Sequence, residues 1–270
     1  MFTSHCLRGA AAALAIALIA GCASPGGNVS NDEKVIKTAF DESSTDQAAR
    51  THVELGGAYL TNHQFDLALD ESKRALAINP QYAPAFNLQG LAFASMDQVD
   101  LARDVFQKAI ALDPTNPDTH HNFGWFLCQQ KNYAAAQEQF QQALAQRVYR
   151  GAVRTWLAAG ICDAQAGNLQ SAKALLAKAQ ALDAFSPVIS INHAEVLYRL
   201  GEFKQAAFYV DRLNAAASHT SPASLALAIK VHHALREEST VADLEKRLMA
   251  KFPESSEAQS VLVNQPMSTR

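Results

Sequence analysis

Residues 83–116 read APAFNLQGLAFASMDQVDLARDVFQKAIALDPTN, and residues 117–150 read PDTHHNFGWFLCQQKNYAAAQEQFQQALAQRVYR. The second stretch repeats the first at an offset of 34 residues, and the same offset reaches back to residue 49. Three of the positions that recur at this spacing carry small residues, and the fourth carries proline: Gly56, Gly90 and Gly124; Ala68, Ala102 and Ala136; Ala75, Ala109 and Ala143; Pro80 and Pro114. A period of this length predicts an array of helical hairpins whose neighbouring units bury each other's apolar faces.

The recurring residues resemble the consensus of the tetratricopeptide repeat (TPR), a unit of two helices. Glycine stands at position 8 of each unit, alanine at positions 20 and 27, and proline at position 32. Position 24 should be large and apolar, as Phe106 and Phe140 are, whereas Ser72 departs from the pattern. Glycine inside a helix costs about 1 kcal/mol relative to alanine. We therefore expect close helix contact at position 8, against the alanine at position 20.

The sequence thus predicts an all-α protein, a right-handed TPR superhelix with a concave groove, built from about six hairpins. The units are expected near residues 49–82, 83–116, 117–150, 153–186, 187–220 and 221–252. The fourth unit begins two residues late, and the sixth is weak because Thr240 and Arg247 stand where alanine is expected. Residues 253–270 are left for a terminal cap or tail, with residues 264–270 expected to be disordered.

The first residues of the chain predict a signal peptide. Residues 1–21 read MFTSHCLRGAAAALAIALIAG, with one cation, Arg8, before an apolar run that is too short to span a bilayer. The run ends in Ile19-Ala20-Gly21-Cys22, which resembles the lipobox of bacterial lipoproteins. The resemblance implies cleavage before Cys22 and lipidation of Cys22 with three acyl chains such as palmitate. An ordinary secretory signal with an incidental cysteine is the alternative.

Three acyl chains suffice for stable anchoring, because each buried methylene contributes about 0.8 kcal/mol. Ala23 stands where an aspartate commonly retains Gram-negative lipoproteins at the inner membrane. The resemblance therefore implies the periplasmic face of the outer membrane, with the lipid bilayer as a partner through the acyl chains. Residues 22–46 predict a flexible tether because they are rich in Pro, Gly, Ser, Asn and Asp. The apolar residues Val35, Ile36 and Phe40 could instead form a short docking helix.

Composition and motifs argue against several classes of function. The chain has 270 residues, is 49% hydrophobic, and carries 23 Lys and Arg against 26 Asp and Glu without a basic block. We therefore expect no nucleic-acid partner. No Walker loop, GxSxG, HExxH or GxGxxG motif occurs, and the adjacent histidines at 120–121 and 232–233 point about 100° apart on a helix. We expect no enzymatic activity, no metal, no cofactor and no small-molecule substrate.

Two cysteines in the repeats stand 34 residues apart, Cys128 and Cys162, in the first helices of units three and four. Those helices should be neighbours in the stack, and the periplasm allows oxidation. A disulfide is the favoured interpretation, with a stabilisation of about 3.5 to 4 kcal/mol in the chain-entropy model. A pair of buried free thiols is the alternative.

The TPR resemblance also nominates a groove, because positions 2, 5, 9, 12 and 13 of each first helix usually line the concave face, and Asn122 stands beside these positions in the third unit. The nominated residues are Val53, Gly57, Leu60, Asn87, Leu91, Ala94, His121, Asn122, Trp125, Gln129, Leu157 and Ile161. This face is apolar with amides and lacks a cationic clamp for a terminal carboxylate, so it suits a hydrophobic or amphipathic peptide. Trp125 either anchors a partner or packs inside the superhelix as ordinary core.

A narrower resemblance rests on the lipobox, about six TPR units, and two segments, Asn122–Cys128 (NFGWFLC) and Ala159–Cys162 (AGIC). Together they resemble the PilF/PilW type IV pilus biogenesis lipoproteins from residue 21 to about residue 253. The resemblance implies a pilotin, which binds the secretin of the type IV pilus and promotes its outer-membrane localisation or multimerisation, and thereby piliation and twitching motility. The alternative is a general periplasmic TPR scaffold for peptidoglycan enzymes or outer-membrane assembly factors.

Overall fold

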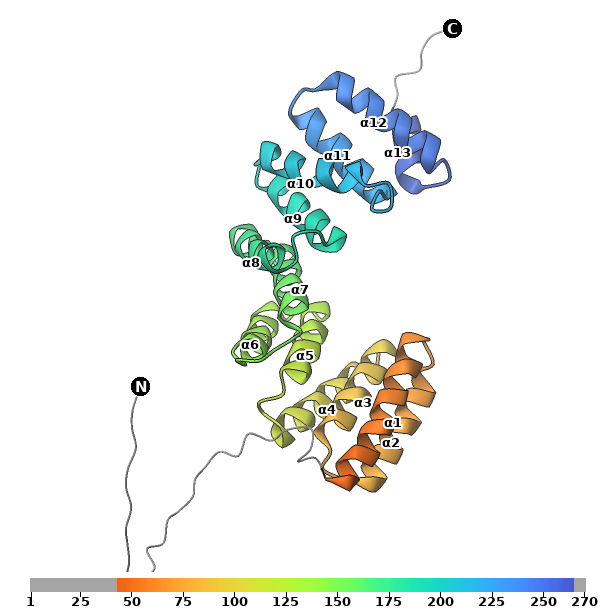
Figure 1. Cartoon of the computed structure of the whole chain (residues 1–270), viewed down its shortest axis with the longest axis vertical. Helices are drawn as coiled ribbons and strands as arrows, with labels where there is room; N and C mark the ends of the chain where they lie inside the picture. Colours follow the sequence, from red (N-terminus) through yellow and green to blue (C-terminus); the bar gives the residue numbers. More distant parts are fainter. Residues whose placement is uncertain (1–42, 265–270) are drawn as a thin grey trace, which may run out of the picture. The chain divides into compact units, whose positions relative to one another are not determined.

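The computed structural model describes residues 43–264 as a series of antiparallel helical hairpins followed by one further helix (Figure 1). The helices are α1 (Ser44–Thr61), α2 (Phe65–Ile78), α3 (Ala83–Ser95), α4 (Val99–Leu112), α5 (Pro117–Gln129), α6 (Tyr133–Leu144), α7 (Ala152–Gln165), α8 (Leu169–Leu182), α9 (Pro187–Arg199), α10 (Phe203–Ala215), α11 (Pro222–Ala234), α12 (Glu238–Lys251) and α13 (Ser256–Asn264). The expected signal peptide, lipid site at Cys22, most of the tether, and residues 265–270 lie outside the described residues.

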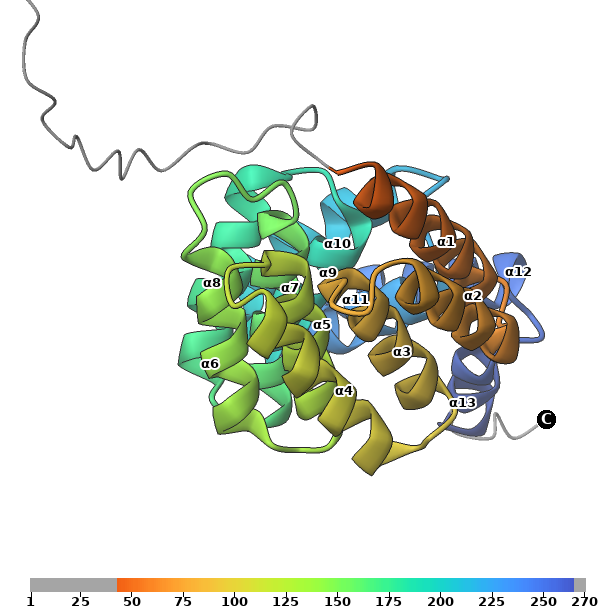
Figure 2. The same cartoon turned by 90° about the horizontal axis from the view of Figure 1, so that it is seen from below.

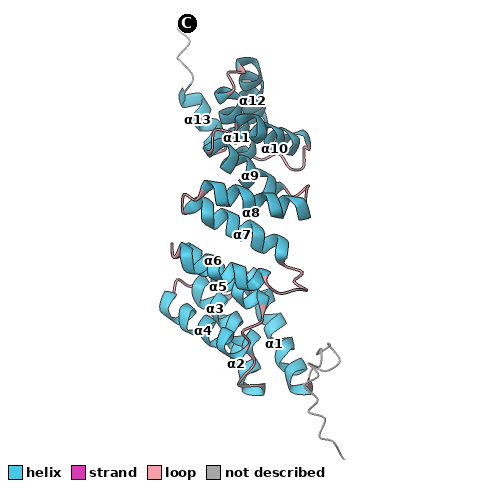
Figure 3. Cartoon of the chain, turned by 90° about the vertical axis from the view of Figure 1, so that its left-hand side faces the viewer, coloured by secondary structure: helices cyan, strands magenta, loops and turns pink. Residues whose placement is uncertain are grey.

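The predicted all-α TPR fold is confirmed, and residues 43–264 contain no strand (Figure 3). Six hairpins, α1/α2 to α11/α12, follow the predicted units. One boundary was wrong, because α1 begins at Ser44, inside the segment expected to be tether. The Ser43 side chain caps this helix by accepting a hydrogen bond from the Asp46 amide at 3.0 Å.

The C-terminal segment and the sixth unit also differ in detail from the prediction. Residues 256–264, which the sequence left as cap or tail, form α13, which contacts α11 and α12. The second helix of the sixth hairpin is one residue late, so that Val241 and Leu248 are buried rather than Thr240 and Arg247. The apparent weakness of this unit is therefore a shift of phase in an intact hairpin.

The hairpins stack so that their first helices line the inner, concave side. Each of α1, α3, α5, α7 and α9 contacts the next first helix in the series, whereas no two successive second helices from α2 to α12 contact each other. Seen along the stack, α5, α7, α9 and α11 lie inside, and α6, α8 and α12 lie outside (Figure 2). Residues on the first helices are therefore the ones available to a partner in the groove.

The glycine at position 8 permits a closer contact than the expected one. A Cβ at Gly90 would lie 2.7 Å from Cδ1 and Cε1 of Phe106, and a Cβ at Gly124 would lie 2.9 Å from the same atoms of Phe140. Both aromatic residues stand at position 24. The expected contact with the alanine at position 20 is present through its backbone, since the space beside Gly124 is also bounded by the carbonyl oxygen of Ala136, 3.2 Å from such a Cβ. The large side chain at position 24 occupies that space because only a glycine leaves room for it.

Two other hairpins support this steric rule. In the fifth hairpin position 8 is Ala194, and the residue facing it at position 24 is the smaller Val210, with both side chains buried. In the first hairpin position 24 is Ser72, and the space beside Gly56 is taken by Leu88 from α3. A small residue at position 8 is therefore accompanied by a large neighbouring side chain, which comes from position 24 or, in the first hairpin, from Leu88. A larger residue at position 8 is accompanied by a smaller one at position 24.

The turn between the two helices of a hairpin requires a left-handed backbone. The residues there with positive φ are His63, Asp97, Lys131, Gly167, Gly201 and Arg236, with φ from 57° to 86°. Left-handed conformation costs a residue with a Cβ about 1–2 kcal/mol. We predict that Lys131→Gly raises the free energy of unfolding by about 0.5–1 kcal/mol in urea titrations. Lys131→Ala is the matched control, and an equal gain in that variant would contradict the explanation.

Candidate partner-binding site

A pocket of about 220 Å³ opens on the concave side between α3 and α5. Its lining consists of apolar, hydroxyl and amide side chains, with no ionisable group: Leu91, Ala94, Ser95, Phe106, Asn122, Trp125, Phe126 and Gln129. The predicted groove residues Leu91, Asn122 and Trp125 therefore converge here. A neutral pocket with an aromatic wall favours an apolar side chain and the backbone around it.

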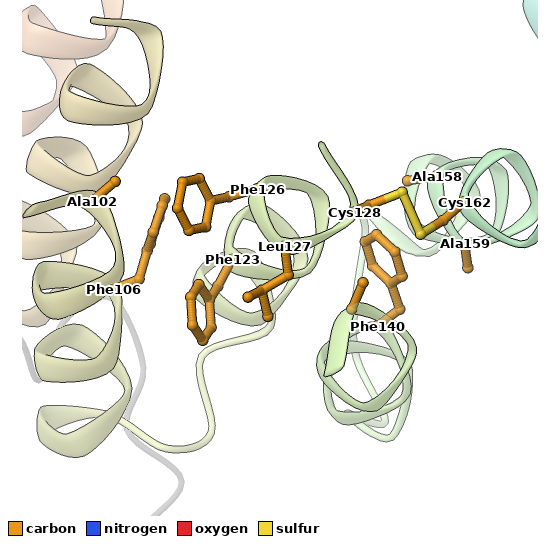
Figure 4. Packing of buried hydrophobic residues seen from close by; sticks show 11 residues of the cluster. Ala102, Phe106, Phe123, Phe126, Leu127, Cys128, Phe140, Ala158, Ala159 and Cys162 are labelled. Carbon is orange, nitrogen blue, oxygen red and sulfur yellow. A yellow bond between two sulfur atoms is a disulfide. The ribbon is translucent and has the colours of Figure 1, made fainter. Parts of the chain in front are cut away.

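Two contacts hold the polar and aromatic parts of the pocket in place. Asn122 Nδ2 donates to Asn87 Oδ1 at 3.1 Å, which ties α5 to α3. Trp125 is partly buried and packs against a core cluster. Figure 4 shows Phe106, Phe123 and Phe126 of this cluster. The Trp125 ring thus combines the two alternatives that the sequence left open: it packs against the core, and it also lines the pocket where a partner could bind.

Ala94 and Gln129 were nominated too and line the pocket, whereas the remaining nominated residues lie outside it. Val53 and Leu60 are partly buried and pack against a cluster that contains Ala68 and Leu88. Leu157 packs in the same manner against the cluster around Leu176. Asn87 and Ile161 are partly buried on α3 and α7. The structure therefore divides the predicted groove into one pocket and several positions whose side chains contribute mainly to packing between hairpins.

His121 is held at the junction of the third and fourth hairpins. Its Nδ1 lies 2.9 Å from Thr155 Oγ1, within a hydrogen bond, and its ring packs on Phe140 with centroids 6.1 Å apart. Burial and, secondarily, the Arg154 guanidinium lower the pKa of His121 from 6.5 to about 4. The imidazole is therefore neutral in the folded protein at neutral pH.

The lowered pKa of His121 predicts an acid-sensitive junction. Between pH 6.5 and about 4 the unfolded chain binds a proton at this residue that the folded protein does not. His121 should therefore reduce the free energy of unfolding by about 1.4 kcal/mol per pH unit as the pH falls through this range. His121→Gln should flatten the pH dependence of urea unfolding relative to a His219→Gln control. Identical slopes in both variants would contradict this assignment.

Parts of the concave face were missed from the sequence. Ser95 stands at position 13, a groove position, and could have been named; Phe106 and Phe126 could not, because their repeat positions mark them as core. A second cavity of about 340 Å³ lies farther along, lined by Ile191, Asn192, Glu195, Ala223, Ala226, Leu227, Lys230 and Glu257. Its charged lining distinguishes it from the neutral Trp125 pocket.

A disulfide joins Cys128 of α5 to Cys162 of α7, with Cα atoms 5.8 Å apart (Figure 4). Both residues are buried. Cys128 lies on the same helix as Trp125, three residues later. The bond therefore fixes the helix that carries the aromatic wall of the pocket to the next hairpin.

His120 and His232, one from each adjacent pair, have structural partners. His120 contacts Gln139 and the carbonyl oxygen of Pro114, and His232 lies between Asp211 and Glu237 at 2.9 and 2.6 Å. No group of three or more His, Cys, Asp or Glu side chains among residues 43–264 could hold a metal ion. Within the same range, no helix is both long and apolar enough to cross a membrane.

Tetratricopeptide-repeat family models match residues 83–116 and 105–138. No curated protein matches the chain at a significant level. Among solved structures, PilW, described as a widely conserved type IV pilus biogenesis factor, is 26% identical with a TM-score of 0.73, over 80% of this chain and 99% of PilW. PilF of Pseudomonas aeruginosa is 26% identical with a TM-score of 0.71, over 82% of this chain and 99% of PilF.

A more distant structure shows only the fold. The Cut9–Hcn1 complex of the APC/C is 17% identical with a TM-score of 0.63, over 80% of this chain and 42% of that one. The likeness to PilW and PilF differs from this one because it extends over nearly the whole length of both proteins at higher identity. The chain therefore has the tetratricopeptide-repeat fold and is similar over most of its length to PilW and PilF.

Proposed function

We propose that this protein is an outer-membrane lipoprotein of type IV pilus biogenesis, acting as a pilotin that binds the secretin and promotes its localisation or multimerisation. The observation that carries the proposal is the neutral Trp125 pocket, on a stack that matches PilW over 99% of its chain. The pocket offers an apolar wall and amide groups, and so suits an uncharged stretch of a partner polypeptide. No step of this function makes or breaks a covalent bond.

The proposed mechanism is co-targeting. The acyl chains on Cys22 hold the protein at the outer membrane, and a secretin subunit bound by the repeats shares that location. Tethering raises the local concentration of secretin subunits at the membrane and thereby favours their assembly. Cys22→Ala should abolish palmitate labelling and release the protein from the membrane fraction, while the folding of the repeats is unchanged. Retained membrane association with labelling would contradict the anchor.

Site-specific crosslinking tests the partner and the surface together. Trp125 is replaced by p-benzoylphenylalanine in the cells that naturally produce the protein, and the captured peptide is identified by mass spectrometry. The expected product is a secretin peptide. The matched control carries the same group in place of Trp156, the only other tryptophan of the chain, which stands on α7 outside the pocket.

The outcomes separate the proposal from its alternative. A secretin crosslink at position 125 but not at position 156, together with loss of secretin multimers in a Trp125→Ala strain, supports the pilotin. Capture of a peptidoglycan hydrolase or an outer-membrane assembly factor at position 125 would instead support a general scaffold. Normal secretin multimers and normal pili in a deletion strain would refute the pilotin role.

A further inference from the structure

Four large apolar side chains are exposed where the fourth hairpin meets the fifth. Leu182 at the end of α8 is 59% exposed, Phe185 in the following loop 79%, Val188 at the start of α9 54%, and Phe208 on α10 60%. The three elements follow one another along the stack (Figure 1). Exposed apolar side chains are ordinary when scattered singly, but a group of them indicates an interaction surface.

Arg212 on α10 joins Phe185 and Phe208 into one surface, which Leu182 and Val188 flank in the sequence. Its guanidinium carbon lies 5.7 Å from the ring centre of Phe185 and 5.4 Å from that of Phe208, and an N–H donates to the carbonyl oxygen of Ala184 at 2.6 Å. Arg212 pairs with no carboxylate of residues 43–264; neighbouring Asp211 pairs with His232 instead. The guanidinium is thus fixed between two exposed rings with its charge unpaired.

The base of this surface is rigid. The Phe208 ring meets the Tyr209 ring edge-on with centroids 5.2 Å apart, and Tyr209 packs on buried His193 at 4.6 Å. The Arg212 guanidinium also lies 5.8 Å from the Tyr209 ring centre. Aromatic and arginine side chains held in this manner lose little conformational entropy when a partner binds, which is the property of an interface hot spot.

The other hairpins act as internal controls for Phe208. Position 22, where Phe208 stands, is exposed in each of the first five hairpins, and the residues there in hairpins one to three are Asp70, Asp104 and Glu138. The fold therefore accepts a carboxylate at this position. An exposed phenylalanine there contributes little to packing, so its presence in the fifth hairpin points to a contact outside the chain.

Phe185 shows the same departure. It stands at position 33 of the fourth unit, where the first two units have the exposed polar residues Gln81 and Thr115 and the third has the partly buried Tyr149. The loop therefore does not require an aromatic side chain at this position. Two independent breaks of the repeat pattern thus fall on one surface.

The cation at position 26 also has a different role in this hairpin. In the second hairpin Lys108 lies over the ring of Phe86 at 4.1 Å, and in the fourth hairpin Lys178 lies over the ring of Trp156 at 4.3 Å. Both rings stand at position 4 of the same hairpin. In the fifth hairpin position 4 is the buried Ser190, and the rings that contact the cation are the exposed ones.

We propose that Leu182, Phe185, Val188, Phe208 and Arg212, here called the Arg212 surface, bind a protein segment in which an aspartate or glutamate adjoins an aliphatic or aromatic side chain. The carboxylate would pair with Arg212, and the apolar side chain would cover the two rings. Charge complementarity selects this partner, because the surface offers one unpaired cation in an apolar frame. The Arg212 surface shares no residue with the Trp125 pocket and does not depend on the identity of the partner bound there.

Crosslinking at this surface tests the proposal with a nearly isosteric probe. The full-length protein carries p-benzoylphenylalanine in place of Phe208 in its natural cells, and the captured peptide is sequenced by mass spectrometry. The matched control places the same group at Val148, the most exposed large apolar residue described, at 90%, which lies outside the surface. Arg212→Gln in the probe background should reduce the yield about tenfold, as expected for loss of a hot-spot charge.

A second pair of variants separates binding from folding. Phe208→Asp, which reproduces the residue of hairpins one and two, should keep the melting temperature and lose the complex. In the captured partner, changing the acid to lysine should abolish the complex, and Arg212→Glu should restore it. A crosslink to lipid, to a second copy of this chain, or to a segment without an acid would overturn the proposal. A yield no higher than at Val148, or no rescue by the charge exchange, would do the same.

Discussion

Gly90→Ala is expected to lower the free energy of unfolding by about 2 kcal/mol. The new Cβ would lie 2.7 Å from two ring atoms of Phe106. The Phe106 ring is fully buried between Phe123 and Phe126, with ring centres 5.4 and 5.7 Å away, so it has little room to move. Overpacking typically costs about 1–3 kcal/mol, and the better helix propensity of alanine offsets up to about 1 kcal/mol of that. Urea unfolding of the purified protein measures the difference.

Gly57→Ala provides the matched control. Gly57 also lies within a helix, but a Cβ there would meet nothing within 4 Å. The substitution should therefore raise the free energy of unfolding by up to about 1 kcal/mol through helix propensity alone. Equal effects at Gly57 and Gly90 would show that the contact with position 24 does not decide the residue at position 8.

A double-mutant cycle tests the pairing of positions 8 and 24 directly. The fifth hairpin carries Ala194 opposite Val210, so Phe106→Val should make room for alanine at position 90. Gly90→Ala should then cost nothing in the Phe106→Val background, which gives a coupling energy of about 2 kcal/mol between the two sites. Additive effects of the two substitutions would contradict the steric account.

Removing the disulfide should have a still larger effect. Cys128 and Cys162 are 34 residues apart in sequence, and opening a loop of that length lowers the free energy of unfolding by about 4 kcal/mol in the chain-entropy model. Cys128→Ala combined with Cys162→Ala should therefore unfold at markedly lower urea concentration. Because both sulfur atoms are buried, part of the loss reflects packing.

Reductant separates the two contributions to this loss. Dithiothreitol should destabilise the natural protein and leave the double variant unchanged, since only the former has a bond to reduce. The difference between the reduced natural protein and the double variant then reports packing alone. Two reactive thiols in the denatured natural protein, without reductant, would show that the bond does not form in cells.

The sequence predicts the hairpins well because a period is a property of the chain itself, whereas contacts between helices are not. The spacing of Gly90 and Gly124 indicates where the units lie. It does not show that position 24 fills the space beside glycine, because that requires the crossing of two helices. Likewise the sixth unit looked degenerate until the structure placed Val241 and Leu248 in its core, one residue out of phase.

In the candidate site, too, the repeat period predicts which positions face the groove, but not how the helices shape the pocket. Positions 9 and 13 led to Leu91, Trp125 and Gln129, because groove positions repeat with the unit. The depth of the pocket depends on how α3 approaches α5, and its floor includes Phe106, which belongs to a second helix. The Arg212 surface could not be anticipated from the consensus, since it consists of residues that depart from it.

The contact of each first helix with the next, and the lack of contact between successive second helices, has a mechanical consequence. A pull on one end of such an array passes through the hairpin junctions in series, as tension passes along a coil spring. The disulfide between α5 and α7 covalently links one of these pairs of neighbouring hairpins. Under load the contacts between the other hairpins should therefore separate first. The third and fourth hairpins, which the disulfide joins, should keep their relative orientation, and with it the position of Trp125 on α5.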